Sequence, residues 1–315
     1  MGEMLAIFAL VLFSSNIIIT KIASSRANMN LGFLISVGMN ILFGSILLTV
    51  QLLFFSEEPI EWNTKGFFLF LLGGVFSTYL GRWFFFETID KLGPTRASAF
   101  QTSNPLFTAV IAWLFLGEIL HWTDVAAIVL ILFGLFLVSF VPQVAAKQEA
   151  AAGREQQSPN HQLKQFVSIK WLIQSGILLA FLSSLSYALG NIVRGVAIQS
   201  WQEPILGGVL GAFAGFVLHT VTNKHTRHFF LELKKSDSIG IILFAISGCI
   251  TITAQILVIA SMHYIPISIA NLITLSTPVL VTPVSYFLFK NQENVTAVTI
   301  LGIILVLSGI TLVIL

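Results

Sequence analysis

The stretch Ser14-Ser15-Asn16-Ile17-Ile18 recurs in looser form as Leu189-Gly190-Asn191-Ile192-Val193, 175 positions further along the chain (191 − 16 = 175). A second stretch, Ser103-Asn104-Pro105-Leu106, matches Ser276-Thr277-Pro278-Val279 at a spacing of 173 positions (278 − 105 = 173). Three further pairs keep the same order in both halves: Pro94 with Pro266, Ala97 with Ala270, and Gly134 with Gly309. Matches that keep their order and nearly keep their spacing indicate two related halves within the 315 residues.

The sequence is too apolar for a soluble protein. Hydrophobic residues make up 56% of it, charged residues only 10%, and the mean hydropathy is +0.91. A soluble domain has about a quarter of its residues charged. The apolar residues instead form runs of the roughly 20 residues that a helix needs to cross the hydrocarbon core. The runs are 4–23, 31–55, 66–89, 94–116, 121–141, 171–193, 203–222, 239–263, 266–289 and 294–315.

Helices are the structure that such runs form in lipid. Open strands would leave peptide groups unpaired, and a barrel would show alternating segments of about ten residues. We therefore predict an all-α integral membrane protein of ten transmembrane helices, with a first five-helix repeat at 1–141, a linker at 142–170 and a second repeat at 171–315. Because five is odd, the second repeat enters the membrane from the opposite face. Inverted repeats are typical of alternating-access transporters, whose substrate site lies near the midplane.

Basic residues in the predicted loops set the orientation, because cytoplasmic loops carry an excess of Lys and Arg. Thirteen lie in odd-numbered loops and only two, Lys65 and Arg194, in even-numbered loops. We predict that the 142–170 linker is cytoplasmic and that both termini lie outside the cell membrane. The thirteen are Lys21, Arg26, Lys91, Arg96, Lys147, Arg154, Lys164, Lys170, Lys224, Arg227, Lys234, Lys235 and Lys290.

One group of motifs resembles a known family. Leu92-Gly93-Pro94-Thr95-Arg96-Ala97-Ser98 is followed by Asn104-Pro105-Leu106 and then by Leu116-Gly117-Glu118. This succession resembles the EamA family of the drug/metabolite transporter superfamily. The second half repeats it, except that Phe289-Lys290-Asn291-Gln292-Glu293 stands where the first half has Leu-Gly-Glu. The resemblance implies ten helices in two inverted halves and transport of metabolites, often export of amino acids or related compounds.

Two charged side chains in the predicted third helix are candidate functional groups, because a charge inside a bilayer is costly unless it is paired or hydrated. Arg82 lies between Gly81 and Trp83, and its guanidinium could bind a substrate carboxylate or phosphate through two parallel hydrogen bonds. The alternatives are a pair with an internal acid such as Glu87, or extension to the membrane surface. Glu87 is a candidate proton-coupling carboxylate, although an i,i+4 pair with Lys91 is the simpler interpretation.

Other polar, aromatic and proline residues within the spans could form a substrate cavity. Asn16 and Asn191 occupy equivalent positions in the two halves, where they could line the cavity or bond across helices. The aromatic and amide candidates for the cavity wall are Tyr79, Trp83, Trp113, Tyr187, Tyr286 and Gln255. Three prolines would interrupt helical hydrogen bonds and expose carbonyl groups to a substrate, or only kink the helix: Pro105, Pro278 and Pro283.

The sequence also argues against several classes of protein. It contains no His-Glu-x-x-His, no Gly-x-Ser-x-Gly and no Walker motif. It also shows neither the rings of charge nor the filter segment that are typical of a channel. The net charge of +2 with scattered basic residues argues against nucleic acid, and the lone Cys249 argues against a disulfide or a multi-cysteine metal site. We expect no cofactor and no metal.

We therefore predict a secondary transporter rather than an enzyme. It would move a small metabolite, an amino acid or a related compound, by alternating access, as an exporter coupled to the proton gradient or to exchange. The alternative is a membrane-embedded enzyme, a drug exporter or a channel-like protein. The expected partners are the small-molecule substrate and the lipid bilayer, and the expected state is a monomer or a homodimer.

Overall fold

The computed structural model describes residues 1–55, 60–92, 101, 103–118, 121–152, 176–222, 229–288 and 297–314. These residues form helices joined by short turns, and no strand occurs among them. The α-helices are α1 (Gly2–Ser24), α2 (Met29–Val50), α3 (Thr64–Gly74), α4 (Arg82–Leu92), α6 (Asn104–Ile111), α7 (Trp122–Ala152), α10 (Ile177–Ser200), α11 (Pro204–Thr222), α12 (Phe229–Lys235), α13 (Ser238–Tyr264), α14 (Ile267–Thr274), α15 (Pro278–Leu288) and α16 (Ala297–Ile314). Three π-helical segments continue them: η1 (Gln51–Phe55), η2 (Val75–Gly81) and η3 (Ala112–Leu116).

Six helices in the described part of the chain have the length and apolarity to cross a membrane. They are Gly2–Ser24, Asn30–Phe55, Thr64–Phe85, Leu178–Ser200, Pro204–Thr222 and Ser238–Tyr264. Four further apolar helices are shorter: Asn104–Leu116, Trp122–Leu137, Ile267–Val281 and Ile300–Leu312. The all-helical membrane class is therefore confirmed, whereas ten complete spans remain a prediction.

Two of the predicted runs differ in detail from the helices that form. The run 266–289 is divided into α14 and α15, and Pro278 is the first residue of α15, where its missing N–H leaves no helical bond unmade. The equivalent Pro105 lies in the first turn of α6, so both halves begin a helix at the same proline. Helix α7 continues past 141 to Ala152: it passes Pro142 and then a stretch rich in Ala, Gln, Glu and Lys, which are strong helix formers. The rest of the predicted linker lies outside the described residues.

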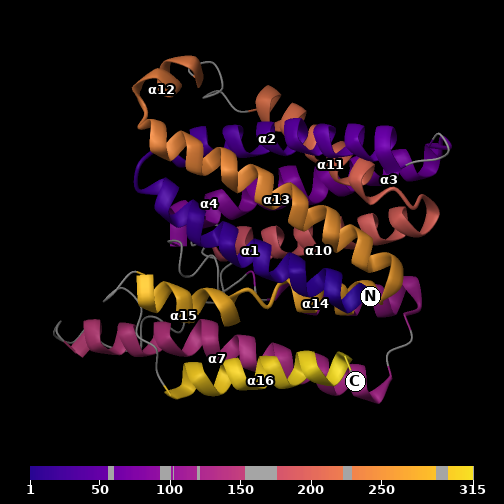
Figure 1. Cartoon of the computed structure of the whole chain (residues 1–315). Coiled ribbons are helices and arrows are strands. Elements are labelled where there is room, and N and C mark those ends of the chain that lie inside the picture. The colour runs from indigo at the N-terminus through magenta and orange to yellow at the C-terminus, as the bar shows by residue number, and fades with distance from the viewer. Residues whose placement is uncertain are drawn as a thin grey trace. The chain divides into compact units, whose positions relative to one another are not determined.

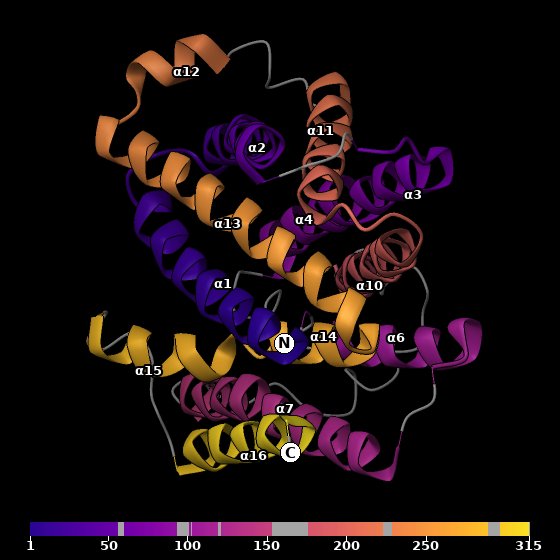
Figure 2. The same ribbon diagram turned by 45° about the vertical axis from the view of Figure 1, so that its right-hand side comes forward.

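The chain divides into two compact units, each built from segments of both sequence halves. Unit 1 comprises Met1–Tyr79 and Leu189–Val281, and unit 2 comprises Leu80–Ala188 and Thr282–Leu315. In unit 1, α13 packs along α1, α2 and α11 (Figures 1 and 2). Glycines allow this close packing, since a Cβ at Gly248 would lie 2.5 Å from the Ser36 carbonyl oxygen.

In unit 2, α7 and α16 lie side by side (Figures 1 and 2). A Cβ at Gly134 would lie 2.6 Å from the carbonyl oxygen of Gly302 and 2.7 Å from Val306. A Cβ at Gly309 would lie 3.0 Å from the carbonyl oxygen of Ala127 and 2.5 Å from Ile131. The equivalent residues are Ala127 and Gly302, Ile131 and Val306, and Gly134 and Gly309, all 175 positions apart (309 − 134 = 175).

This contact is therefore its own counterpart: the residues that α7 uses against α16 are equivalent to those that α16 uses against α7. Residue numbers rise along one helix as they fall along the other, so the two helices are antiparallel. An antiparallel, self-equivalent pair is the geometry that a two-fold axis produces. It supports the repeat at the level of individual contacts.

We predict that Gly134→Ala destabilises the protein by about 1–3 kcal/mol, because the new methyl group meets backbone atoms of α16 that cannot rotate away. Gly309→Ala should cost less, because its nearest neighbour is the Ile131 side chain, which can shift. The control is Gly38→Ala, since a Cβ at Gly38 would meet nothing within 4 Å. The measurement is thermal unfolding in detergent. Equal melting temperatures for Gly134→Ala and Gly38→Ala would contradict the packing described.

Candidate functional site

Arg82 is the first residue of α4 and directly follows the π-helical segment η2. A π-helical segment inserts extra residues into the helical ladder and often marks a functional site. The guanidinium-bearing side chain is half-buried, and Gly81 before it is buried. The arginine therefore lies at a defect in an otherwise regular membrane helix.

A chain of hydrogen bonds in unit 2 supports the backbone at this defect. The Gln101 Nε2 donates to Ser183 Oγ at 2.7 Å, and Ser183 Oγ donates to the carbonyl oxygen of Gly81 at 2.8 Å. Ser183 is fully buried on α10, so it fixes the carbonyl that precedes Arg82. A loosened helical carbonyl inside a membrane protein needs such a partner, because no water or lipid can replace it.

Tyr187 lies one turn after Ser183 on α10, on the same helix face. The hydroxyls of Ser103 and Ser184 lie 3.2 Å apart. We call these six polar residues the Arg82 cluster: Arg82, Gln101, Ser103, Ser183, Ser184 and Tyr187. It contains a cation, an amide and four hydroxyl groups, the kinds of group that bind an anionic, hydrogen-bonding group, although the Ser183 hydroxyl is already bonded to Gly81 and Gln101.

Sequence reasoning found only Arg82 and Tyr187 of this cluster. Gln101, Ser183 and Ser184 were missed because small polar residues are common in membrane helices. The available signal was the spacing of Ser183 and Tyr187, which are four residues apart and therefore share a helix face. Ser103 was visible only as part of the repeated Asn-Pro motif.

The other candidate residues in unit 2 differ in how exposed their side chains are. Trp83 is 45% exposed and stacks on Phe84, with ring centroids 5.5 Å apart, and Trp113 is 59% exposed. Glu87 is exposed. Pro283 lies inside α15 and is half-buried. The side chains of Tyr286 and of Pro278, which belongs to unit 1, lie outside what the structure describes.

In unit 1, Asn16 and Asn191 each bond to a different helix. Asn16 Oδ1 accepts a hydrogen bond from Ser247 Oγ on α13 at 2.5 Å. Asn191 Nδ2 donates to Asn271 Oδ1 on α14, also at 2.5 Å. Both amides therefore make interhelical bonds, which is one of the two roles that the sequence allows.

Tyr79 and Gln255 are half-buried residues of unit 1. The Gln255 Oε1 is buried and makes no hydrogen bond to any residue of the described chain. A buried amide oxygen without a donor is costly, so Gln255 has unused capacity to accept a bond. Its part in a substrate cavity remains a prediction.

Arg194 corrects the sequence analysis, which counted it as a residue of an even-numbered loop. It lies inside α10, is 5% exposed, and its Nη2 donates to Thr78 Oγ1 at 3.2 Å. The error arose because the arginine itself ended the apolar run, although Ala197 and Ile198 continue it. The even-numbered loops therefore keep only Lys65 of their two counted basic residues.

Comparisons with known proteins show which family the chain belongs to. A family model for the EamA-like transporter family matches residues 1–140 and 174–315. No match to a curated protein is found. A crystal structure of a protein shares the fold, with a TM-score of 0.64 and 14% sequence identity, over 99% of this chain and 96% of that chain. The family match covers both halves, so the chain belongs to the EamA-like transporter family and is a multi-pass membrane transporter of the drug/metabolite type.

Proposed function

We propose that this transporter is a secondary transporter that exports a small metabolite with a carboxylate or a similar anionic group, such as an amino acid. The observation that carries the proposal is the placement of Arg82 at the end of η2, with the Ser183 hydroxyl holding the preceding carbonyl. A guanidinium within a membrane helix favours an anion over a neutral or cationic cargo. Export is supported by the family resemblance alone.

The hydroxyl groups of the Arg82 cluster would select the rest of the substrate. Tyr187 and Ser184 lie on α10 one helical turn or less from Ser183, so they present hydroxyls on neighbouring parts of one helix. A hydroxyl both donates and accepts, which suits an ammonium or a hydroxyl group near the carboxylate. An amino acid combines these features in one small molecule.

Alternating access would expose this site to one membrane face at a time. The repeat supports it, because two inverted halves can exchange their conformations and so convert an inward-open state into an outward-open one. We propose that proton transfer at Glu87, or exchange of one substrate for another, drives the cycle. On the orientation set by the loop charges, the 142–170 linker is cytoplasmic.

We predict that Arg82→Gln lowers transport of the physiological substrate at least about tenfold, because the variant loses the charge that binds the anion. The substrate is first identified by comparing intracellular and extracellular metabolite pools with and without the protein, and then measured in proteoliposomes. Arg82→Lys keeps the charge without the two parallel donors, so its transport rate should lie between those of the natural protein and Arg82→Gln. If Arg82→Gln folds and keeps both the affinity and the rate of the natural protein, Arg82 does not bind the substrate.

We predict that Glu87→Gln removes the dependence of transport on an imposed pH gradient, because an amide cannot carry the proton. Substrate-for-substrate exchange should persist in the variant. Glu61→Gln, which changes an acid of a predicted outer loop, serves as the control and should behave as the natural protein does. An unchanged response of Glu87→Gln to the gradient would exclude Glu87 as the coupling group.

We predict that a cysteine in the linker is protected from a membrane-impermeant maleimide in intact cells. The native Cys249 is first replaced by Ala, since it is the one cysteine of the sequence. Ser158→Cys should then react only after permeabilisation, whereas Glu58→Cys, in a predicted outer loop, should react at once. The reverse pattern would overturn the proposed orientation.

A further inference from the structure

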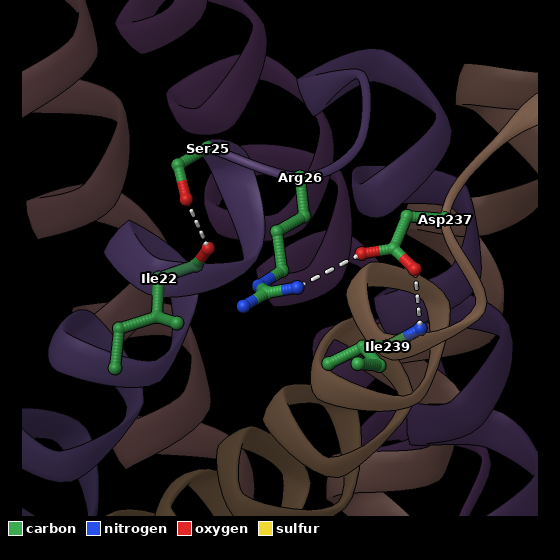
Figure 3. Close-up of polar contacts among 5 residues, drawn as sticks. All are labelled: Ile22, Ser25, Arg26, Asp237 and Ile239. Atoms are coloured by element: carbon green, nitrogen blue, oxygen red, sulfur yellow. Dashed lines mark hydrogen bonds and ion pairs between the residues drawn. The ribbon is translucent and has the colours of Figure 1, made fainter.

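The turn after α1 is tied to the start of α13 by an ion pair. Arg26 Nη1 lies 3.1 Å from Asp237 Oδ2, and the side chains are 45% and 40% exposed (Figure 3). The second carboxylate oxygen of Asp237 accepts the Ile239 N–H at 3.2 Å and so caps α13. A Cβ at Gly240 would lie 3.1 Å from Arg26 Cβ, so the turn also packs against the helix.

The turn after α10 is tied to the start of α3 in a different way. Trp201 Nε1 donates to the Glu61 carbonyl oxygen at 3.0 Å, and Asn63 Nδ2 donates to the Ser200 carbonyl oxygen at 2.9 Å. Asn63 Oδ1 accepts the Gly66 N–H at 2.9 Å and so caps α3. Trp201 is only 6% exposed, and a Cβ at Gly66 would lie 2.5 Å from its Cβ.

These two contacts are equivalent under the internal repeat. Arg26 and Trp201 are 175 positions apart (201 − 26 = 175), and the two caps, Asn63 and Asp237, are 174 apart (237 − 63 = 174). The two glycines under the turns, Gly66 and Gly240, are also 174 apart. The same architectural contact is therefore made twice, once by an ion pair and once by an indole and an amide.

The two contacts lie at opposite ends of unit 1. Asp237 precedes the first residue of α13, whereas Gln199, next to the Trp201 turn, donates to the carbonyl oxygen of Met262 near the last residue of α13. A helix of 27 residues is about 40 Å long at about 1.5 Å per residue. The ion pair and the indole are thus separated by the length of α13.

We propose that the Arg26–Asp237 pair is a salt-sensitive latch, and that unit 1 opens more readily at this end than at the Trp201 end. An exposed ion pair contributes little and is screened by salt. A buried indole with a bonded N–H contributes apolar contact area that salt does not weaken. On the orientation proposed above, the latch faces the cytoplasm, so its opening would bias the cycle toward a cytoplasm-open state.

The test is hydrogen–deuterium exchange of the full chain in lipid nanodiscs at about 0.02 M and about 0.5 M salt, which span weak and strong screening. The peptides read are 22–29 and 237–243 at the latch, and 60–67 and 199–204 at the other end. Asp237→Asn removes the charge but keeps an N-capping oxygen, and it places at 237 the residue type found at 63. Arg26→Gln removes the other charge, and Asn63→Ser is the matched variant at the Trp201 end.

For the natural protein we expect salt to speed exchange at the latch roughly two- to fivefold and to leave the Trp201 end unchanged. Asp237→Asn and Arg26→Gln should exchange fast at the latch at both salt concentrations, and the double variant no faster. Asn63→Ser should speed exchange at its own end without any salt dependence. Salt dependence that persists in Asp237→Asn or Arg26→Gln, or equal salt dependence at both ends, would overturn the latch. Because the readout involves no substrate, it is independent of the proposed transport function.

Discussion

The constraint that governs this structure is that a peptide group in hydrocarbon must find its hydrogen bond within the protein. It makes every described span a helix, and it makes each departure from helical geometry conspicuous. At the end of η2 the Gly81 carbonyl is held by Ser183, whose hydroxyl is in turn held by Gln101. Ser183 and Gln101 thus meet the requirement of the irregular backbone at this point. On the proposed function, the substrate site and the support of this carbonyl share the side chain of Ser183.

The internal repeat makes the helix packing symmetric, but two buried or half-buried arginines do not follow the repeat. The α7–α16 contact is self-equivalent down to single glycines, and the caps Asn63 and Asp237 begin equivalent helices. The arginines, by contrast, have no counterparts. At the local offset of 174, Arg82 corresponds to Ile256 (82 + 174 = 256), and at 175, Arg194 corresponds to Ile19 (194 − 175 = 19). Two related folds can build a symmetric frame, but the anionic cargo that we propose would need a cation at only one place in it.

The sequence predicts the helices well because length and apolarity are local properties. It does not predict that the ninth run, 266–289, divides in two, and the structure begins α15 at Pro278, where the missing N–H leaves no helical bond unmade. It fails at Arg194, because the sixth run was ended at Val193 although the apolar Ala197 and Ile198 continue it and are buried. It misses Ser183 because a serine on any membrane helix can bond to its own preceding turn, and only the structure shows this one bonding to Gly81 instead. The π-helical geometry of η2 leaves no sequence signal that we identify.

Arg82 and Arg194 differ in what surrounds them, and this decides which one the proposal assigns to the substrate. A Cβ at Gly73 would lie 2.7 Å from Arg194 Cγ, and a Cβ at Gly211 would lie 3.1 Å from its Nη2. The Arg194 side chain thus occupies the space left by missing side chains on α3 and α11, and it holds Thr78 within η2. Such a residue packs helices together. Arg82 lies instead directly after that same segment, next to the Gly81 carbonyl that Ser183 on α10 holds, and on the proposed function its guanidinium binds the substrate.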